Sequence, residues 1–380
     1  MERNLTDICR IQYGYAFDSN KFSDSEGIPL IRIRDVVRGY SETYTTEECG
    51  AEYVVHNGDM LIGMDGEFNI SQWKGGKAYL NQRVCRLIPT DEVDALYLFY
   101  FMPKALKAIE DKTPFVTVKH LSAKELNKVI VPIPAMEEQK KIANSLQKVD
   151  ELIALRKEQL AKLDQLVKSR FIELFGDLAS PECKWQIEKL VDACADPDDI
   201  KCGPFGTQLS KDEYQSDGVA VWEIPQINSR FSTTPTHYLS ENKAKQLEAY
   251  SIKAGDIAMS RKGNVGKCAV FPSDFEAGII HSDVLRIRVD STRVLPVFMM
   301  HQLHYSGAVQ QQIELVSSGA IMAGINVTKL KQILVHIPPM NLQTQFVSFV
   351  KQTDKSKLTI QQSLDKLELL KKSLMQRYFG

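Results

Sequence analysis

Residues 134–176 read PAMEEQKKIANSLQKVDELIALRKEQLAKLDQLVKSRFIELFG, and residues 338–380 read PPMNLQTQFVSFVKQTDKSKLTIQQSLDKLELLKKSLMQRYFG. The two segments align without a gap, 204 residues apart. Apolar side chains recur in the first copy at positions 142, 146, 149, 153, 160, 163, 167 and 174, which is the spacing of a coiled-coil seam. No proline interrupts either segment after its start, and each closes on a glycine. Each segment therefore predicts one helix of roughly 60 Å, and we expect the two helices to pack antiparallel and to hold two domains apart.

Polar residues interrupt the seam at different places in the two copies. Arg156 and Arg170 fill seam positions in the first copy, and Thr353, Lys357 and Lys371 do so in the second. Such residues can fix the register and the pairing of a coiled coil. They can equally lie at splayed, solvated points of the seam, and the sequence favours neither interpretation.

The regions that precede the two helices also repeat, more loosely. The corresponding segments are, in order, 28–33 and 219–224 (strand-like), 53–62 and 250–259 (strand, Gly-Asp turn, strand), 80–87 and 280–287 (strand-like), 95–109 and 296–315 (helical), and 126–133 and 330–337. This pattern predicts an α+β protein with a pseudo-two-fold internal repeat. Two similar globular domains, at 1–133 and 177–337, are separated by the two long helices, at 134–176 and 338–380, which pair as an antiparallel coiled coil. Residues 177–184 have the composition of a linker.

The composition is that of an ordinary soluble protein with room for two or three domains. The net charge of −1 argues against a general polycation, although local basic patches are compatible with it. No apolar run approaches the length of a membrane span, and the N-terminus lacks the apolar core of a signal peptide. The seven cysteines show no C-x-x-C spacing, so we expect reduced thiols in the cytoplasm and neither a disulfide frame nor a zinc site.

The repeated long helices and the motifs around them resemble the specificity subunit of type I restriction–modification enzymes. The motif that enters each helix is VPIPAMEEQ at 131–139 and IPPMNLQ at 337–343. The turns NGDMLI at 57–62 and AGDIA at 254–258 also fit, as does GPFGTQL at 203–209. Each motif alone is common, whereas their order and their double occurrence at one offset are specific. The resemblance covers the whole chain.

The resemblance implies a division of labour among subunits. Each globular domain would be a target recognition domain that reads half of a bipartite site on double-stranded DNA. The helices would set the spacer between the half-sites and dock two methyltransferase subunits. This chain would hold no catalytic residue, metal or cofactor, because S-adenosylmethionine, ATP and Mg would serve the methyltransferase and restriction (translocase) subunits. One departure is the lead-in WQIEKL at 185–190, which has no counterpart before Leu5 and puts the edge of the first domain in doubt.

Two glycine-rich polar loops are candidates for DNA contact. The loop 65–77 and its counterpart 260–267 both carry cations beside glycines, so the backbone can come close to a phosphate. The candidate contacts are Lys74 and Lys77 in the first loop, and Arg261, Lys262 and Lys267 in the second. The same residues also fit a solvated hairpin tip with ordinary charges.

A second set of candidates lies on or near the predicted strands. Arginine suits guanine, and asparagine and glutamine suit adenine, in direct readout of bases. The residues of this kind are Arg32, Arg34, Gln82 and Arg83 in the first half and Gln226, Asn228 and Arg230 in the second. His281 and Ser282 hold the place that matches Gln82 and Arg83. A solvated strand edge is an equal interpretation for the arginines at 32 and 34 and for their counterparts.

Several signals of an enzyme fail. The run GNVGKC at 263–268 lacks the spacing and the hydroxyl of a phosphate-binding loop. No glycine-rich fingerprint for S-adenosylmethionine follows a strand, and no His-x-x-x-His pair indicates a metal site. The competing hypotheses are a methyltransferase or nuclease in its own right, and a structural coiled-coil adaptor or decayed subunit without DNA recognition.

Overall fold

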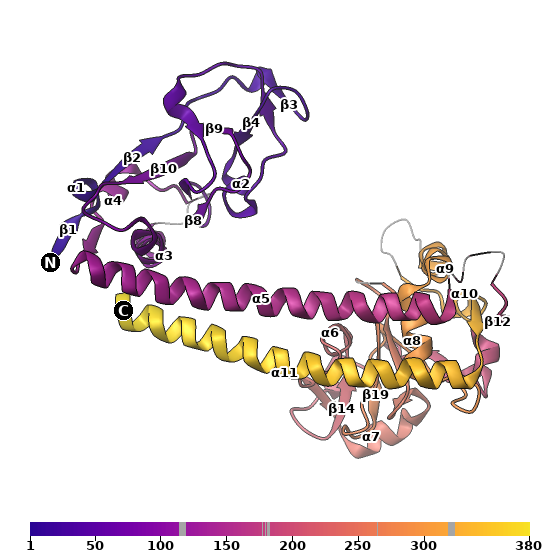
Figure 1. Cartoon of the computed structure of the whole chain (residues 1–380). Coiled ribbons are helices and arrows are strands. Elements are labelled where there is room, and N and C mark those ends of the chain that lie inside the picture. Colours follow the sequence, from indigo (N-terminus) through magenta and orange to yellow (C-terminus); the bar gives the residue numbers. More distant parts are fainter. Residues whose placement is uncertain (114–118, 177, 179, 181–182, 264, 318–323) are drawn as a thin grey trace. The chain divides into compact units, whose positions relative to one another are not determined.

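The structure is a computed structural model that describes residues 1–113, 119–176, 178, 180, 183–263, 265–317 and 324–380 (Figure 1). The chain divides into two compact units: unit 1 comprises Met1–Lys157 and Gln362–Gly380, and unit 2 comprises Glu158–Gln361. Both boundaries fall inside the long helices, so each helix contributes to both units. Below, domain 1 denotes residues 1–133 and domain 2 denotes residues 177–337. Residues 177, 179, 181 and 182 of the predicted linker lie outside the described residues.

Domain 1 combines short strands with short helices. The strands are β1 (Glu2–Asn4), β2 (Cys9–Tyr13), β3 (Phe22–Ser23), β4 (Ile28–Ile31), β5 (Tyr44–Thr45), β6 (Val54–Val55), β7 (Met60–Gly63), β8 (Asn69–Gln72), β9 (Ala78–Leu80), β10 (Val84–Pro89) and β11 (Ile130–Pro132). The helices are α1 (Leu5–Ile8), α2 (Ile33–Arg38), α3 (Ala95–Lys112) and α4 (Ala123–Asn127). The strands form sheets in the orders β2-β10-β7-β8, β3-β5-β4-β9-β6 and β1-β11.

Domain 2 has the same plan. The strands are β12 (Gln186–Lys189), β13 (Ile200–Cys202), β14 (Val219–Trp222), β15 (His237–Leu239), β16 (Ser251–Ile252), β17 (Ile257–Ser260), β18 (Cys268–Val270), β19 (Gly278–Ile280), β20 (Val284–Ile287) and β21 (Leu334–Ile337). The helices are α6 (Ile224–Asn228), α7 (Glu241–Gln246), α8 (Pro296–Tyr305), α9 (Gly307–Ser317) and α10 (Val327–Leu330). The sheet orders β13-β20-β17-β18, β15-β14-β19-β16 and β12-β21 repeat those of domain 1, except that the edge strand β3 has no matching strand. The predicted α+β internal repeat is confirmed.

The two long helices are α5 (Met136–Phe175) and α11 (Met340–Phe379), each 40 residues long. Within each unit their segments pair side by side and antiparallel (Figure 1). In unit 1 the Nζ atom of Lys157 lies 3.0 Å from a carboxylate oxygen of Glu368, and that of Lys371 lies 2.6 Å from Asp150. The partner number falls as the position on α5 rises, which is the pattern of antiparallel helices.

The polar seam residues make contacts between the helices. In unit 2 the Nζ atom of Lys357 lies 2.6 Å from Oδ1 of Asp164 on the facing helix. In unit 1 Nε of Arg156 donates to Oγ of Ser363 at 3.2 Å. These contacts favour the interpretation in which the polar seam residues fix the pairing over the one in which they are merely solvated.

The end of each long helix belongs to the core of the unit in which it finishes. Phe175, at the end of α5, is buried in unit 2, with its ring centroid 4.8 Å from that of Phe298. Phe379, at the end of α11, is buried in unit 1, 5.4 Å from the ring of Tyr97 and 5.8 Å from that of Phe101. The aromatic residue that the repeat places at the end of each segment therefore docks the helix onto a globular core.

A buried glutamine fixes the start of each long helix. The Oε1 atom of Gln139 accepts the backbone N–H of Asp94 at 2.9 Å, and its Nε2 donates to the carbonyl of Pro134 at 3.0 Å. Gln343 repeats the arrangement with the N–H of Leu295 at 2.8 Å and the carbonyl of Pro338 at 2.8 Å. Buried backbone groups need such partners. The glutamine of the entry motif thus joins the helix to the loop that precedes α3 or α8.

The predicted Gly-Asp turns exist, but the strands on either side of each turn do not form a hairpin. In domain 1 β6 pairs with β9, whereas β7 pairs with β8 and β10. Gly58 adopts a positive φ of 93°, which glycine tolerates. Asp59 accepts the N–H of His56 at 2.9 Å and binds the buried Arg86 at 2.8 Å. The turn therefore carries the chain from one sheet to another, and the arginine holds it in place.

Four other segments differ from the predicted ones. The strands predicted at 28–33 and 219–224 end earlier, and α2 and α6 begin directly after them. The side chain of Asp35 in α2 accepts the N–H of Arg32 at 2.9 Å, and that of Gln226 in α6 accepts the N–H of Glu223 at 3.1 Å. These reciprocal caps initiate the helices. The loop predicted at 65–77 contains β8, and the predicted helix 296–315 is divided into α8 and α9.

Candidate nucleic-acid interface

Domain 1 has a cleft at the ends of the parallel strands β4 and β9. The cavity is about 310 Å³, and it is lined by Arg32, Asn81, Gln82, Arg83 and two aromatic rings, those of Phe17 and Phe22. Because β4 and β9 run parallel, with Ile31 opposite Leu80, the residues that follow each strand emerge at the same edge. The structure thereby brings three of the predicted site residues, Arg32, Gln82 and Arg83, into one cleft. We call this cleft 1.

Domain 2 has a cleft at the same place in the fold, which we call cleft 2. The cavity is about 870 Å³ and lies at the ends of the parallel strands β14 and β19. Trp222 lies opposite Ile280, so Glu223 holds the position of Arg32, and His281 holds that of Asn81. Counting on from His281, Ser282 and Asp283 match Gln82 and Arg83, so the predicted match of His281 and Ser282 to that pair is wrong by one position. Cleft 2 is lined by Glu223, His237, His281, Ser282, Asp283 and Tyr214, among others.

Each cleft has an ion pair at its rim. The pair occupies the same place in both domains, but the positions of the cation and the anion are exchanged. In domain 1, Nε of Arg83 lies 3.7 Å from Oδ2 of Asp65. In domain 2, Oδ1 of Asp283 lies 2.8 Å from Nζ of Lys262. Asp65 follows the end of β7 by two residues, as Lys262 follows the end of β17. The cation of domain 1, Arg83, therefore belongs to the segment that lines the cleft, whereas the cation of domain 2, Lys262, belongs to the neighbouring loop.

The carboxylates of cleft 2 are held by their neighbours. The Nδ1 atom of His237 lies 2.8 Å from Oε2 of Glu223, and the ring of Tyr214 stacks on that of His237 at 4.6 Å. The hydroxyl of Thr236 donates to the same glutamate oxygen at 3.2 Å. The Glu223 side chain retains 18% exposure. Cleft 2 is thus a polar cavity with two partly exposed carboxylates.

The remaining predicted residues of domain 1 are solvent-facing. Arg34 lies on α2, is half exposed, and donates from Nη2 to Oγ1 of Thr43 at 3.3 Å. Lys74 and Lys77 are exposed in the turn between β8 and β9. The aromatic residue of this loop, Trp73, is 1% exposed and donates to the carbonyl of Gly76 at 2.7 Å, so it supports the turn from within.

The candidates in domain 2 near α6 are not in the position that we predicted. Gln226 corresponds to Asp35 of domain 1, is 2% exposed, and donates to the carbonyl of Thr234 at 3.0 Å. Its amide is therefore used inside the domain in this conformation. Asn228 is half-buried, and Arg230 is exposed with a positive φ of 52°. Glu223 is the residue that takes the place of Arg32.

The second predicted loop lies beside cleft 2. Arg261 donates to the carbonyls of Ile325 at 3.1 Å and Ser282 at 3.4 Å, and its guanidinium lies 5.1 Å from the ring centroid of Phe205. Lys262 pairs with Asp283, as described above. Lys267 is half-buried, and Asn264 of this loop lies outside the described residues.

Sequence reasoning missed three members of cleft 2. Glu223, His237 and Asp283 were not candidates, because the search for DNA contacts favoured cations and amides. The signal was present in the alignment of 80–87 with 280–287, which sets Asp283 opposite Arg83. The contribution of Asp65 to the rim of cleft 1 follows only from the three-dimensional register.

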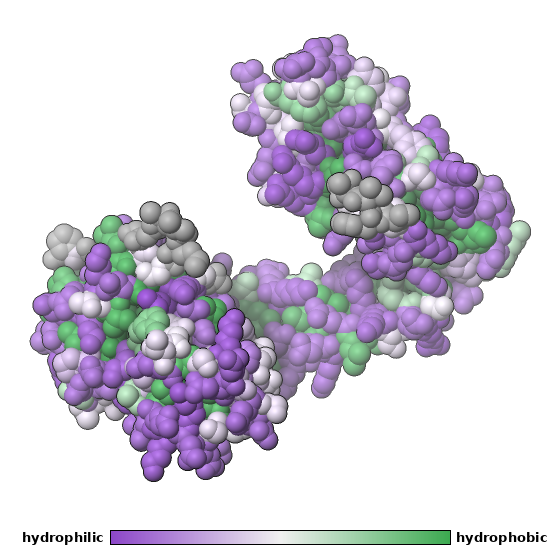
Figure 2. Space-filling view, turned by 180° about the vertical axis from the view of Figure 1, so that it is seen from behind, coloured by the Kyte–Doolittle hydropathy of each residue, from purple (hydrophilic) through white to green (hydrophobic). Residues whose placement is uncertain are grey.

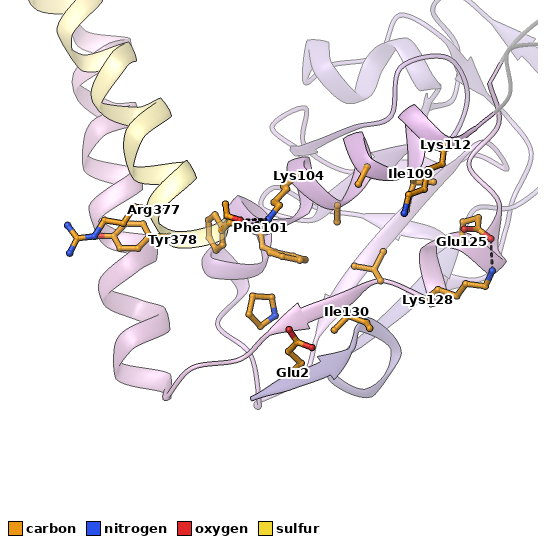
Figure 3. A pocket seen from close by; sticks show the side chains of 16 residues that line it. Glu2, Phe101, Lys104, Ile109, Lys112, Glu125, Lys128, Ile130, Arg377 and Tyr378 are labelled. Carbon is orange, nitrogen blue, oxygen red and sulfur yellow. Dashed lines mark hydrogen bonds and ion pairs between the residues drawn. The ribbon is translucent and has the colours of Figure 1, made fainter.

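A third cavity, of about 740 Å³, lies in unit 1 where the end of α11 meets α3 and the β1-β11 sheet (Figure 3). Lys104 of α3 donates to the backbone carbonyl of Phe379. Cations and aliphatic residues share the lining, among them Lys112, Lys128 and Ile130. The side chain of Ile130 is 54% exposed.

The described residues hold neither a metal-binding cluster nor a helix suited to a membrane. They contain no group of three or more histidine, cysteine, aspartate or glutamate side chains arranged to hold a metal ion. Over the same residues, none of the helices combines the length and the apolar character that a membrane span requires.

Comparison with known proteins now adds to this geometry. A family model described as the type I restriction modification DNA specificity domain matches residues 1–165 and again residues 200–369. The chain belongs to this family, the specificity subunits of type I restriction–modification systems. It is 27% identical to the type I restriction enzyme EcoBI specificity subunit of Escherichia coli, over 99% of this chain and 84% of that protein. It is 21% identical to the MjaVIII specificity subunit of Methanocaldococcus jannaschii, over 91% of this chain and 87% of that protein.

Solved structures show the same fold. The S subunit of a type I restriction–modification system from M. genitalium matches with a TM-score of 0.63 at 14% identity, over 100% of this chain and 96% of that one. A chain from a structural study of complex assembly and conformational transition in the type I system matches with a TM-score of 0.56 at 16% identity, over 100% and 97%. Both support two similar α+β domains with two long helices.

Proposed function

We propose that each globular domain reads one half of a bipartite site on double-stranded DNA through its cleft. The observation that carries the proposal is that clefts 1 and 2 occupy the same place in a repeated fold but are lined by different side chains. A shared framework with divergent rim residues suits two readers of two different sequences. Exposed cations outside the clefts, such as Lys74, Lys77 and Arg230, would contact phosphates and position the domains without reading bases.

The long helices would set the spacing between the two half-sites. Each is continuous for 40 residues through the boundary between the compact units. A helix rises about 1.5 Å per residue, so a heptad corresponds to about 10 Å, or roughly three base pairs of DNA. Polar pairs such as Lys357–Asp164 would hold the register on which this spacing depends.

The chain would dock two methyltransferase subunits through apolar residues that the repeat exposes twice. Ile130 on β11 and Leu334 on β21 are 204 residues apart and are 54% and 46% exposed. Leu166 and Leu370 on the long helices form a second such pair, with 49% and 45% exposure. Apolar residues are visible among hydrophilic ones along the helices (Figure 2). Equivalent exposed residues in both halves suit two copies of one partner. These methyltransferase subunits would supply S-adenosylmethionine chemistry, and separate restriction (translocase) subunits would supply ATP and Mg chemistry.

The test is to co-express the chain with candidate methyltransferase subunits and to sequence the methylated bases of the host DNA. We expect one bipartite motif with a fixed gap, which disappears when this chain is deleted. Deleting the facing heptads 152–158 and 363–369 together should leave both half-sites intact and shorten the gap by about three base pairs. Deleting only 152–158 is the control, because it breaks the register of the pair.

Two outcomes would contradict the proposal. Methylation that does not depend on this chain would favour a coiled-coil adaptor or a decayed subunit. A double heptad deletion that folds and methylates the original gap would show that the helices do not set the spacing.

A further inference from the structure

We infer that the two clefts read bases of opposite hydrogen-bond polarity. Cleft 1 donates hydrogen bonds to a base edge that carries acceptors, as guanine does, and cleft 2 accepts a hydrogen bond from an exocyclic amino group, as on cytosine or adenine. This inference rests on the proposed function, in which each domain reads one half-site, and it assigns the residues that make the distinction. They are Arg32 and Arg83 in cleft 1 and Glu223 and Asp283 in cleft 2.

Cleft 1 presents donors. The Arg83 side chain is 52% exposed at the end of β9, and Arg32 is exposed at the end of β4. Asp65 approaches Nε of Arg83, and Nδ1 of His120 approaches Nη1 at 3.4 Å. A guanidinium carries five N–H donors in a planar fork, so these two contacts orient the group and leave donors for a ligand. An arginine fork matches the two major-groove acceptors of guanine.

Cleft 2 presents acceptors at the matching positions. Glu223 and Asp283 are 18% and 26% exposed in their side chains, and each is held on one side by a cation or histidine. An ionised carboxylate has two oxygens with about four lone-pair sites, so His237 and Lys262 leave acceptor capacity free. An amino group on a base would be bound by these carboxylates, and Lys211, which also lines the cavity, would remain for a phosphate.

The reversed ion pairs explain how one framework supports both polarities. A lone change of Arg83 to a carboxylate would set it beside Asp65, and two like charges at that distance repel each other. Domain 2 has an aspartate at the position of Arg83 and a lysine at the position of Asp65, so the two side chains still attract each other. The bond from the backbone N–H of Met64 to the carbonyl of Arg83, at 3.0 Å, recurs between Arg261 and Asp283 at 2.8 Å. The backbone is thus constant while the charge facing the cleft is inverted.

The test exchanges the polarity of one cleft while the net charge stays constant. In domain 1 the variant is Asp65→Lys with Arg83→Asp, and in domain 2 it is Lys262→Asp with Asp283→Arg. The control is Arg38→Glu with Glu42→Arg, which reverses an exposed ion pair of 3.2 Å on the same domain but outside the cleft. Each full chain, co-expressed with the methyltransferase subunits, is used for methylome sequencing and for selection of binders from a random duplex library.

We expect the wild type to require guanine at one position of the half-site read by domain 1. The domain 1 variant should lose this preference in favour of cytosine or adenine, and bind the original site roughly ten- to a hundredfold more weakly. The half-site read by domain 2 should not change. The domain 2 variant should do the reverse, acquiring guanine in its own half-site, and the control should keep both half-sites and the affinity.

The outcomes separate the two levels of the argument. If the wild type gives no bipartite motif, the proposed function fails. If it gives one, but a folded domain 1 variant keeps the original half-site, or the half-site read by domain 1 contains no G·C base pair, only the polarity inference fails. Should an exchange variant unfold on heating before the wild type, Arg83→Gln and Asp283→Asn replace it. Each of these variants should lower discrimination between bases at a single position of its own half-site. If both variants leave the discrimination unchanged, the inference is overturned.

Discussion

Each domain has a buried arginine and, three residues earlier in the chain, a member of the ion pair at the cleft, and these two features have diverged very differently. Arg86 on β10 and Arg286 on β20 hold matching positions and are 9% and 4% exposed. Three residues earlier, Arg83 in domain 1 is matched by Asp283 in domain 2. Leaving a buried charge without its partner costs several kcal/mol, roughly 3–5. A half-exposed pair contributes about 0–1 kcal/mol, so its sign can be exchanged at little cost.

The partners of the buried arginines show how much freedom the framework keeps. Arg86 binds Asp59 directly and donates to the carbonyl of Val54 at 2.9 Å. Arg286 donates to the carbonyl of Ser251 at 2.7 Å, and the aspartate of that turn, Asp256, is bound instead by Arg288, at 2.7 Å through both nitrogens. Burial lowers the pKa of Arg286. The cation in the interior is kept, while the aspartate of the turn is bound in domain 2 by an arginine two residues further along the chain.

The largest effect that we expect concerns the aromatic residue that ends each long helix. Phe175→Ala should destabilise unit 2 and Phe379→Ala should destabilise unit 1, each by roughly 3–5 kcal/mol, because a buried ring is replaced by a cavity. Site-resolved hydrogen exchange measures the two units separately. Leu369→Ala on α11 is the control, because that side chain is 68% exposed and should change little.

This pair of variants can break the comparison between the units. If Phe175→Ala lowers the protection of domain 1 as strongly as that of domain 2, then the two units unfold as one, and the core assignment of the helix ends does not describe their stability. If each variant instead lowers the protection of its own unit alone, and by a similar amount, the repeat preserves the docking of each helix as well as its sequence.

The long helices, the domain plan and the repeat could be predicted from the sequence, because each depends on a periodic or duplicated pattern. The seam spacing predicts the helices whatever they pack against. The Gly-Asp turns were located correctly, yet the strands beside them belong to different sheets. Strand pairing over long distances is set by packing of whole sheets, which a local pattern such as 53–62 does not contain.

The clefts could be predicted only in part. Arg32, Gln82 and Arg83 were candidates on chemical grounds, but their convergence depends on the parallel pairing of β4 with β9. Gln226 was aligned with the wrong element, because a cap at the start of α6 and a base-reading amide have the same residue type. A search that expects cations on DNA-binding surfaces also passes over Glu223, whose role depends on its place opposite Arg32 in the repeat.

A second prediction concerns the pH dependence of stability, which should differ between the two units. Burial lowers the pKa of His301 to about 4, and also that of His304 to about 4. The Nε2 atom of His304 accepts the N–H of Cys268 at 3.2 Å, so it must be unprotonated in the folded domain. The matching positions on α3 are Tyr100 and Pro103, which do not titrate in this range.

The sign follows from the two states. An unfolded histidine takes up a proton as the pH falls through about 6.5, whereas these folded histidines do not until about pH 4. The unfolded state is therefore favoured increasingly as the pH falls, and unit 2 should lose on the order of 2 kcal/mol per histidine between pH 7 and pH 5. Hydrogen exchange at both pH values should show the loss in unit 2, and His301→Gln should reduce it by about half. An equal loss of stability in unit 1 would mean that carboxylates, which both units contain, cause the effect.

The smallest effect concerns the polar pairs of the seam, and it tests whether they serve stability or register. Lys357 is 17% exposed and Lys371 is 38% exposed in their side chains. A double-mutant cycle of Lys357→Gln with Asp164→Asn should give roughly 0.5–1 kcal/mol of coupling, and Lys371→Gln with Asp150→Asn should give less, because solvent screens the more exposed pair. Energies this small cannot hold the helices together, since apolar side chains do that.

The polar pairs are large enough in energy to disfavour a pairing shifted by one heptad, in which several such pairs would be lost together. Lys357→Leu should therefore leave the free energy of unfolding nearly unchanged or raise it, while it broadens the spacer tolerated in methylation. A variant that keeps a single spacer would assign the register to the domains at the helix ends.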